Sequence, residues 1–271
     1  MLSRRDREVD RSGDATMPAI DFYEVGMPCW VDHATQDILL SNAFYEILFG
    51  WESEDQGEEL GHYTLFRKDG KVVAGNSPMM NDGQTSRWST YISVDDADAT
   101  IARATAAGAV VFLPPMEVMD LGRMAVFADS AGAAVGLWQP KSFRGAELVG
   151  EVGGFVWTEL NTRDLAAERV FYRAVFGWEP LVADMGAMSY TEWKPGDDSI
   201  AGMLEMPQEA PPETPAYWLT YLGIDNTDAK VERALELGGS VLLPPTDIPP
   251  GRFAVLADID GALFAVITTE A

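Results

Sequence analysis

Apolar and polar residues alternate with a changing period along the first half of the chain. An apolar run over residues 26–34 predicts a strand, and the spacing of apolar residues after it predicts a helix over about 37–48. Gly50 would end this helix, because glycine readily adopts the left-handed backbone of a helix C-terminus. Short strands are predicted at 63–66 and 71–75.

The same order of elements then starts again. A second strand and helix are predicted at 88–94 and 95–107, followed by a strand at 110–113. A hairpin of two strands, 124–128 and 133–138, closes the unit. We therefore interpret residues 26–140 as two β-α-β-β-β modules.

The second half of the chain repeats the first half in the same order. The matching segments are 30–37 with 157–164, 44–52 with 171–179, 88–95 with 218–225, 113–115 with 243–245, and 128–133 with 257–262. An ordered set of matches at nearly constant spacing indicates an internal duplication. The sequence thus predicts two tandem domains, 26–140 and 153–269, joined by a polar, glycine-containing linker at 141–151. We expect the charged segment 1–20 to be a disordered leader.

Composition and charge exclude several classes of function. The 43 acidic and 19 basic residues give a net charge of −24, which disfavours binding to nucleic acid or to an anionic membrane. The sequence lacks the run of ~20 apolar residues that a membrane span needs, and it lacks a secretory signal. The single cysteine, Cys29, rules out an internal disulfide framework and fits a reducing compartment. We therefore expect a cytoplasmic protein.

The motif Asp-x6-Phe-Tyr-x3-Phe-Gly-Trp after the first strand, and Val-Asp-Asp at the second helix, resemble the vicinal oxygen chelate superfamily. This superfamily includes glyoxalase I, bleomycin-resistance proteins and extradiol dioxygenases, and the chain is most similar to the two-domain glyoxalase-like proteins of actinomycetes. The resemblance implies an α+β fold, in which each domain forms a cupped mixed sheet with helices on its outer face. It also implies paired domains, as an intramolecular pseudo-dimer in a monomer, or a homodimer.

The resemblance places the metal ligands of the superfamily on residues that cannot bind a metal. The four positions fall on Trp30, Ala74–Gly75, Ser89 and Gly136 in the first copy, and on Trp157, Ala201–Gly202, Leu219 and Ala265 in the second. Divalent metals need carboxylate, imidazole or thiolate ligands. We therefore expect no metal, and we expect neither glyoxalase I nor dioxygenase chemistry.

The two histidines offer little catalytic chemistry. His33 follows Asp32, so it points to the opposite, helix-packed face of its strand, where we favour a buried structural role. His62 begins a strand, and its function stays open.

Strand alternation predicts which side chains line the concave face of each domain. Trp30 and Asp32 share one face of the first strand, and Ser89 and Tyr91 point the same way. The predicted substrate-binding residues are Trp30, Trp157, Ser89, Trp138, Asn161 and Leu219. Aromatic walls with few polar groups suit a planar aromatic ligand, although packing in the core is the alternative for the tryptophans.

One acid in each copy lies on this aromatic face. An apolar wall raises the pKa of a carboxyl group, so Asp32 and Glu159 are the candidate proton-transfer residues, with Tyr91 and Tyr221 as hydrogen-bond donors. The alternative is a salt bridge from these acids to Arg123 or Arg252.

These residues favour an enzyme of secondary metabolism that acts without metal on a planar, polyketide-like aromatic molecule. The expected chemistry is acid/base dehydration or cyclisation, that of a lyase or cyclase, with an NADPH-dependent reductive step as the neighbouring possibility. Two alternatives stay open: a protein that binds and sequesters an antibiotic, and a partner-binding scaffold.

Overall fold

The computed structural model describes residues 23–79, 85–184, 189–196, 198–208 and 210–269, so the leader 1–20 lies outside the described residues. The elements of the first copy are β1 (Pro28–Thr35), α1 (Ile38–Phe49), β2 (Glu52–Asp55), the 3-10 turn η1 (Glu58–Leu60), β3 (Thr64–Lys68), β4 (Lys71–Pro78), β5 (Arg87–Ser93), α2 (Ala97–Ala106), β6 (Val110–Val118), β7 (Gly122–Ala128) and β8 (Ala134–Pro140).

The second copy has the same order. Its elements are β9 (Phe155–Thr162), α3 (Leu165–Phe176), β10 (Glu179–Asp184), β11 (Ser189–Lys194), β12 (Ala201–Glu205), β13 (Tyr217–Gly223), α4 (Thr227–Glu236), β14 (Ser240–Ile248), β15 (Gly251–Ala257) and β16 (Leu263–Thr269).

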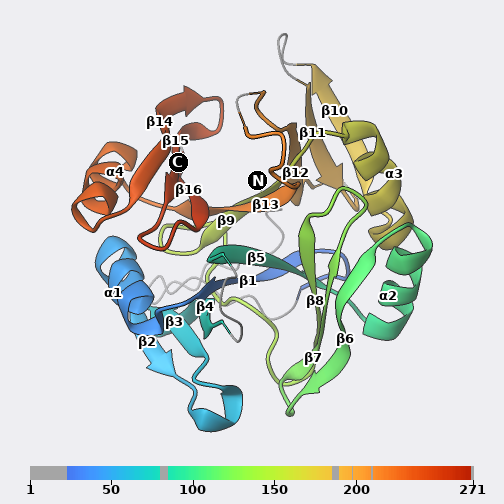
Figure 1. Cartoon of the computed structure of the whole chain (residues 1–271), viewed down its shortest axis with the longest axis horizontal. Coiled ribbons are helices and arrows are strands. Elements are labelled where there is room, and N and C mark those ends of the chain that lie inside the picture. The colour runs from blue at the N-terminus through green and yellow to red at the C-terminus, as the bar shows by residue number, and fades with distance from the viewer. Residues whose placement is uncertain (1–22, 80–84, 185–188, 197, 209, 270–271) are drawn as a thin grey trace, which may run out of the picture.

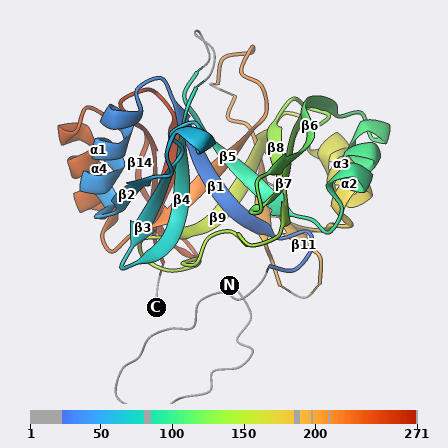
Figure 2. The ribbon, with the colours of Figure 1, turned by 90° about the horizontal axis from the view of Figure 1, so that it is seen from below.

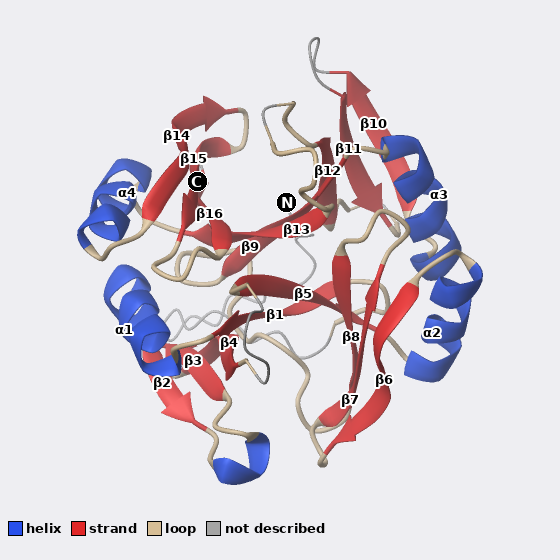
Figure 3. Cartoon of the chain, in the orientation of Figure 1, coloured by secondary structure: helices blue, strands red, loops and turns tan. Residues whose placement is uncertain are grey.

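Each copy forms one eight-stranded mixed sheet, and the two sheets have equivalent strand orders. The orders are β2-β3-β4-β1-β5-β8-β7-β6 and β10-β11-β12-β9-β13-β16-β15-β14. Within each module the first and last strands pair in parallel, as β1 does with β4 and β5 with β8, while β1 and β5 pair antiparallel at the centre. The predicted α+β fold of two repeated domains is confirmed (Figure 3).

Two edge strands differ from the sequence-based expectation. The four residues of β2 are all exposed, so this strand has no apolar alternation from which it could be predicted. The predicted strand at 110–113 extends through Pro114 and Pro115 to Val118 as β6. The register of β6 against β7 shifts between Leu113 and Met116, and an edge strand with a bulge tolerates proline.

Helix α1 shows how local sequence sets an element boundary. The side chain of Asp37 accepts a hydrogen bond from the Leu40 backbone N–H, which caps the first turn. Gly50 ends the helix with φ +66°, and its N–H donates to the Glu46 carbonyl. Asp164 and Gly177 have the same two roles at α3.

The helices lie on the outer faces of the sheets, and the copies pack with these faces toward each other. Helix α1 lies beside α4 on one side of the molecule, and α2 lies beside α3 on the other (Figures 1 and 2). Phe44 and Tyr45 of α1 accordingly pack in one core with Phe264 of β16. Each of the two large hydrophobic cores therefore combines a module of one copy with a module of the other.

Equivalent hydrogen bonds join the two copies on both sides of the molecule. The indole N–H of Trp88 donates to Tyr45 Oη (2.9 Å), whose O–H donates to Asp258 Oδ2 in the other copy (2.8 Å). Trp218, Tyr172 and Asp129 form the same series, with distances of 2.9 and 2.7 Å. We call each series of tryptophan, tyrosine and aspartate a seam.

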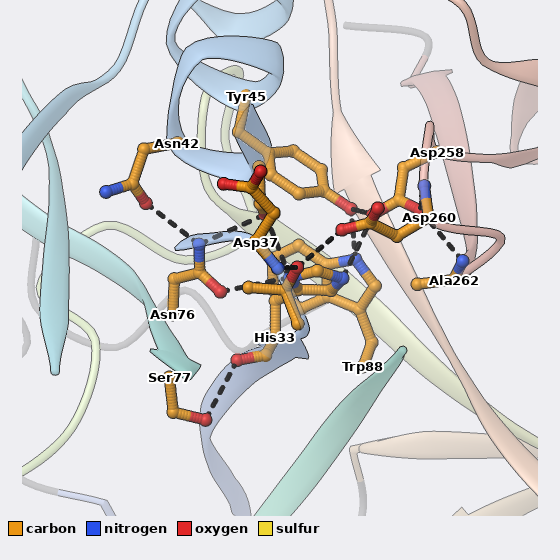
Figure 4. Close-up of polar contacts among 12 residues, drawn as sticks. His33, Asp37, Asn42, Tyr45, Asn76, Ser77, Trp88, Asp258, Asp260 and Ala262 are labelled. Carbon is orange, nitrogen blue, oxygen red and sulfur yellow. Dashed lines mark hydrogen bonds and ion pairs between the residues drawn. The ribbon is translucent and has the colours of Figure 1, made fainter. Parts of the chain in front are cut away.

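The two seams differ in the side chain that lies beside the buried aspartate. His33 Nε2 lies 3.0 Å from Asp258 Oδ2 (Figure 4). Burial favours a raised pKa for Asp258, but His33 and the Tyr45 hydroxyl outweigh it, so its pKa is lowered. His33 is fully buried on the helix-packed face, which confirms the predicted location. Leu160 stands at the position of His33 in the second copy.

In the other seam a second carboxyl group takes the place of the histidine. Glu168 of α3 is fully buried, and its Oε1 accepts a hydrogen bond from the Ser130 hydroxyl (2.5 Å). Burial, and next the charge of Asp129, raise the pKa of Glu168 to about 8. Burial also raises the pKa of Asp129. At neutral pH this seam therefore contains a protonated glutamate beside an aspartate.

The linker 141–151 packs closely on the sheets. Ala146 and Leu148 are buried, the Ala146 N–H donates to the Cys29 carbonyl (2.9 Å), and Tyr23 Oη donates to the Ala146 carbonyl (2.6 Å). A Cβ at Gly145 would lie 2.3 Å from the Cys29 oxygen, so only glycine fits there. Contacts with the first copy therefore position the linker around Gly145 and Ala146.

We expect the stability of the protein to fall as the pH rises toward 9, and Glu168→Gln to reduce this fall. The pKa of Glu168 rises from 4.5 to about 8 on folding, so its contribution is fully present below about 4.5 and is lost as the pH rises through 8. Glutamine does not ionise, so the variant should be more stable than wild type at pH 9 by ~1 kcal/mol or more. Urea denaturation at pH 5, 7 and 9 measures this.

Glu232→Gln is the matched control, because Glu232 is an exposed residue of α4. It should keep the wild-type pH dependence. Equal slopes for wild type and Glu168→Gln would show that Glu168 does not titrate in the seam.

Candidate functional site

The candidate site lies at the centre of the first sheet, on the face opposite to the helices. Asp32 of β1 stands beside Gly75 of β4 and Ser89 of β5 in the strand register. Trp30 pairs with Tyr91, which in turn pairs with Gly136 of β8. Strand alternation therefore brings together the side chains that the sequence pattern assigned to this face.

Two tyrosines donate hydrogen bonds to the Asp32 carboxyl group. The O–H of Tyr91 lies 3.0 Å from Oδ2, and that of Tyr63 lies 3.3 Å from the same oxygen. The indole N–H of Trp30 donates to Tyr63 Oη at 2.9 Å. Trp30, Tyr63 and Asp32 thus form one continuous hydrogen-bonded series, in which Asp32 is the final acceptor.

Burial sets the protonation behaviour of this group. Asp32 is 8% exposed, and burial raises its pKa to about 6 although Tyr91, Tyr63, Arg87 and Ser89 all act to lower it. Burial, and next the charge of Asp32, raise the pKa values of Tyr63 and Tyr91 well above 10, so both phenols stay protonated donors. Asp32 alone of these three groups exchanges a proton near neutral pH.

The alternative of a salt bridge to Arg123 is wrong. Arg123 pairs with Asp98 (2.6 Å) and Glu117 (3.2 Å). In the second copy Arg252 pairs with Asp228 and Asp247, not with Glu159.

The second copy has an equivalent but different site. Tyr221 Oη donates to Glu159 Oε1 at 3.1 Å, and the Trp157 N–H donates to Tyr190 Oη at 3.0 Å. Burial raises the pKa of Glu159, while Tyr190, Tyr221 and Asn161 act to lower it. Leu219 is buried in the place that Ser89 has in the first copy. The second site is therefore less polar beside its carboxyl group.

Tyr63 and Tyr190 were not among the residues predicted from sequence. They occupy equivalent positions of the repeat, directly after His62 and Ser189, and that equivalence was the available signal. His62 itself lies at the surface, where it pairs with Asp55 at 3.0 Å. The exposed turn places the histidine outside the site and the tyrosine inside it.

Glycines make room for these tyrosines at two of the positions that the superfamily uses for metal ligands. A Cβ on Gly75 would lie 1.8 Å from Tyr63 Oη, and one on Gly136 would lie 2.3 Å from Tyr91 Cδ1. In the second copy a Cβ on Gly202 would lie 1.9 Å from Tyr190 Oη. A side chain that reached for a metal from these positions would collide with the tyrosine rings. The residues present therefore do not fit the metal of the superfamily.

Two general features of the described residues bear on function. No group of three or more His, Cys, Asp or Glu side chains among them is arranged to hold a metal ion. Within the same residues, none of the helices has the length and apolar character for crossing a membrane.

Aromatic side chains share the inner face of the first sheet with the Asp32 carboxyl group. Trp30 and Trp138 are buried, and Phe143 of the linker contacts both rings edge-on. In the second copy Trp157 is half-buried, and Tyr221 stacks with Phe253 at a ring distance of 6.1 Å. Trp51 and Trp178 are core residues, and their N–H groups donate to Gly153 and Gly26 carbonyls across the copies.

Known proteins match the whole described fold. The family model of the Glyoxalase/Bleomycin resistance protein/Dioxygenase superfamily matches residues 30–137 and 154–266. A putative glyoxylase, CFP32, of Mycobacterium bovis is 38% identical over 258 residues, covering 93% of this chain and 98% of that protein. The anthracycline biosynthesis protein DnrV of Streptomyces peucetius is 40% identical over 261 residues, covering 89% and 93%.

Solved structures share the fold at low identity. The Mn(II)-bound glyoxalase from Novosphingobium aromaticivorans aligns with a TM-score of 0.63 at 17% identity, over 90% of this chain and 82% of that chain. The 2,2',3-trihydroxybiphenyl 1,2-dioxygenase from Sphingomonas wittichii aligns with a TM-score of 0.62 at 15% identity, over 90% and 91%.

We expect alanine at Gly136 or Gly75 to damage the site in two distinguishable ways. The new Cβ of Gly136→Ala meets the buried ring of Tyr91, which should lower the free energy of unfolding by ~1–3 kcal/mol. That of Gly75→Ala would lie 1.8 Å from Tyr63 Oη and 2.4 Å from Cζ, so the ring of Tyr63 should move away from Asp32 and the pKa of Asp32 should rise. Denaturation and NMR titration measure these effects.

Gly196→Ala is the control, because nothing lies within 4 Å of its added Cβ. Wild-type stability in Gly136→Ala would contradict the close packing of Tyr91 on this glycine.

Proposed function

This chain belongs to the Glyoxalase/Bleomycin resistance protein/Dioxygenase superfamily, and we propose that it is a metal-independent enzyme of secondary metabolism. Its substrate is a planar, polyketide-like aromatic molecule, and its chemistry is acid/base dehydration or cyclisation. The observation that carries the proposal is the Asp32 carboxyl group, buried on an aromatic face, with a pKa of about 6.

The proposed dehydration needs one group that both takes and gives a proton. The Asp32 carboxylate removes a proton from a carbon next to a substrate carbonyl, and the C–H electron pair forms the new double bond. The resulting carboxylic acid then protonates the hydroxyl group on the adjacent carbon, which leaves as water. A pKa near 6 keeps both forms of Asp32 populated near neutral pH.

The neighbouring residues have supporting roles in this proposal. Tyr91 and Tyr63 hold the carboxyl group in place by donating their hydroxyls to it. Trp30 and Trp138 supply flat apolar surface for the ring system. In the second copy Glu159 and Tyr221 form the corresponding pair, with Trp157, Asn161 and Leu219 around them.

The relatives support the metabolic setting. DnrV and its counterpart DauV of a Streptomyces strain are named as anthracycline biosynthesis proteins, and both match the chain at 39–40% identity. A reductive step with NADPH is the alternative to acid/base chemistry, and we assign no residue to it. A protein that binds and sequesters such molecules is the second candidate, because the same aromatic face serves binding without chemistry.

We expect Asp32→Asn to lower turnover by roughly a hundredfold or more and to change ligand affinity little, because only proton transfer is lost. The assay follows dehydration of a hydroxylated polycyclic aromatic ketone by the absorbance change of the extended conjugation.

The same substitution, Asp32→Asn, should have a different effect on the free energy of unfolding. Since burial raises the pKa of Asp32 from 3.8 to about 6, its contribution to stability is lost as the pH rises through 6. The neutral asparagine should therefore leave stability at pH 7 unchanged or higher.

Glu159→Gln is the matched control in the second copy and should reduce turnover less, because Ser89 adds a polar group only in the first copy. Normal turnover by Asp32→Asn would refute the mechanism and favour the sequestering protein.

We expect the purified protein to gain no thermal stability from added Mn²⁺, Zn²⁺, Ni²⁺ or Fe²⁺. The tyrosine rings over Gly75 and Gly136 leave Asp32 as a single carboxylate ligand, which is insufficient for tight binding. A shift of several degrees with one equivalent of metal, or about one metal ion per chain by elemental analysis, would overturn this expectation.

A further inference from the structure

A phenylalanine ring lies against two indole rings on the aromatic face of the first sheet. The ring centre of Phe143 is 5.0 Å from that of Trp30, with perpendicular planes, and 5.8 Å from that of Trp138, at 80°. These are favourable edge-to-face contacts. Phe143 is half-buried, whereas both tryptophans are buried, so the phenylalanine is the outermost ring of the three.

Phe143 comes from the linker and not from a strand of the sheet. Its N–H donates to the Leu121 carbonyl (3.1 Å), and its carbonyl accepts from the Trp138 indole N–H (2.8 Å). Gly145, with φ +123°, follows two residues later and turns the chain toward Cys29. The linker thus reaches the aromatic face as a strap held at both ends, with the phenylalanine between them.

The three-ring arrangement is not required by the fold. The second copy builds the same eight-stranded sheet with Ile267 at the position of Trp138. Trp157, the equivalent of Trp30, is half-buried there. A second indole and a linker ring in the first copy therefore add aromatic surface that the sheet itself does not need.

This aromatic surface adjoins the proposed proton-transfer group. Trp30 lies two residues from Asp32 on the same face of β1, a separation of about 7 Å along the strand. The indole of Trp30 also connects to Asp32 through Tyr63. A planar ligand ring in the place of Phe143 would thus contact Trp30, which is hydrogen-bonded through Tyr63 to Asp32.

We propose that Phe143 occupies the place of an aromatic ring of the ligand, so that the linker is a built-in competitor for the site of the first copy. The inference rests on the proposed function, whose aromatic ligand it locates against Trp30 and Trp138. The ligand binds when the linker withdraws the phenylalanine ring. In the free protein Phe143 covers the indole rings of Trp30 and Trp138.

Competition of this kind lowers apparent affinity by the fraction of molecules in which the site is open. Removing the ring removes the competitor, so Phe143→Ala should bind a flat aromatic ligand about five- to tenfold more tightly than wild type. Phe143→Trp enlarges the competitor and should bind more weakly. An ordinary wall residue would behave oppositely, because its loss removes contact area and weakens binding.

The experiment is calorimetric titration of the full chain with 1,8-dihydroxyanthraquinone as the probe. The variants are Phe143→Ala, Phe143→Trp, Trp30→Ala and, as the matched control, Phe112→Ala, which removes an exposed phenylalanine of β6. Tighter binding by Phe143→Ala, weaker binding by Trp30→Ala and unchanged binding by Phe112→Ala would support the proposal. Phe143→Leu retains apolar volume without the ring, and it replaces the alanine variant if that one does not fold.

Two outcomes would count against it, and they are distinguishable. If Trp30→Ala weakens binding while Phe143→Ala and Phe143→Leu bind as wild type or more weakly, Phe143 is part of the wall. The role of Phe143 as a competitor of the ligand is then refuted, and the proposed function stands. If neither wild type nor any variant binds the probe, both the competitor and the proposed aromatic ligand are contradicted.

Discussion

The structure depends on one constraint: each sheet has an apolar outer face that its own helices cover only in part, so that the other copy must cover the rest. Its helices occupy part of that face, and the remainder packs against the partner module. Burying the ends of two sheets together also buries Asp129 and Asp258, which need donors away from water. Tyr172 and Tyr45 supply these donors across the seams. The outer faces are used in this way, and Asp32 and Glu159 lie on the inner faces.

The seams show that two equivalent positions solve the same problem with different chemistry. One aspartate is balanced by an imidazole and the other by a protonated glutamate, although the tryptophan and tyrosine that approach it are the same. The two copies can differ in these residues because each buried charge needs a partner only in its immediate surroundings. The difference gives the two sides of the molecule opposite responses to pH.

The inner face of the first sheet has a carboxyl group held between two phenols, Asp32 between Tyr63 and Tyr91. Gly75 and Gly136 lack the side chains that would reach a metal, and their missing Cβ atoms admit Tyr63 and Tyr91. The same apolar surroundings that raise the pKa of Asp32 also keep the tyrosines protonated. Fold and chemistry are thus separable here: the sheet is that of the superfamily, while the group at its centre is different.

The sequence by itself determined the duplication, the order of strands and helices, and the face on which Trp30, Asp32 and Tyr91 lie, because periodicity and strand alternation are local properties. It did not reveal β2, whose exposed residues carry no pattern. Only the tertiary structure decided that Arg123 pairs elsewhere, that Tyr63 reaches Asp32, and that Phe143 lies against Trp30. These contacts join different elements of the fold, and their geometry follows from packing and burial, which no local pattern encodes.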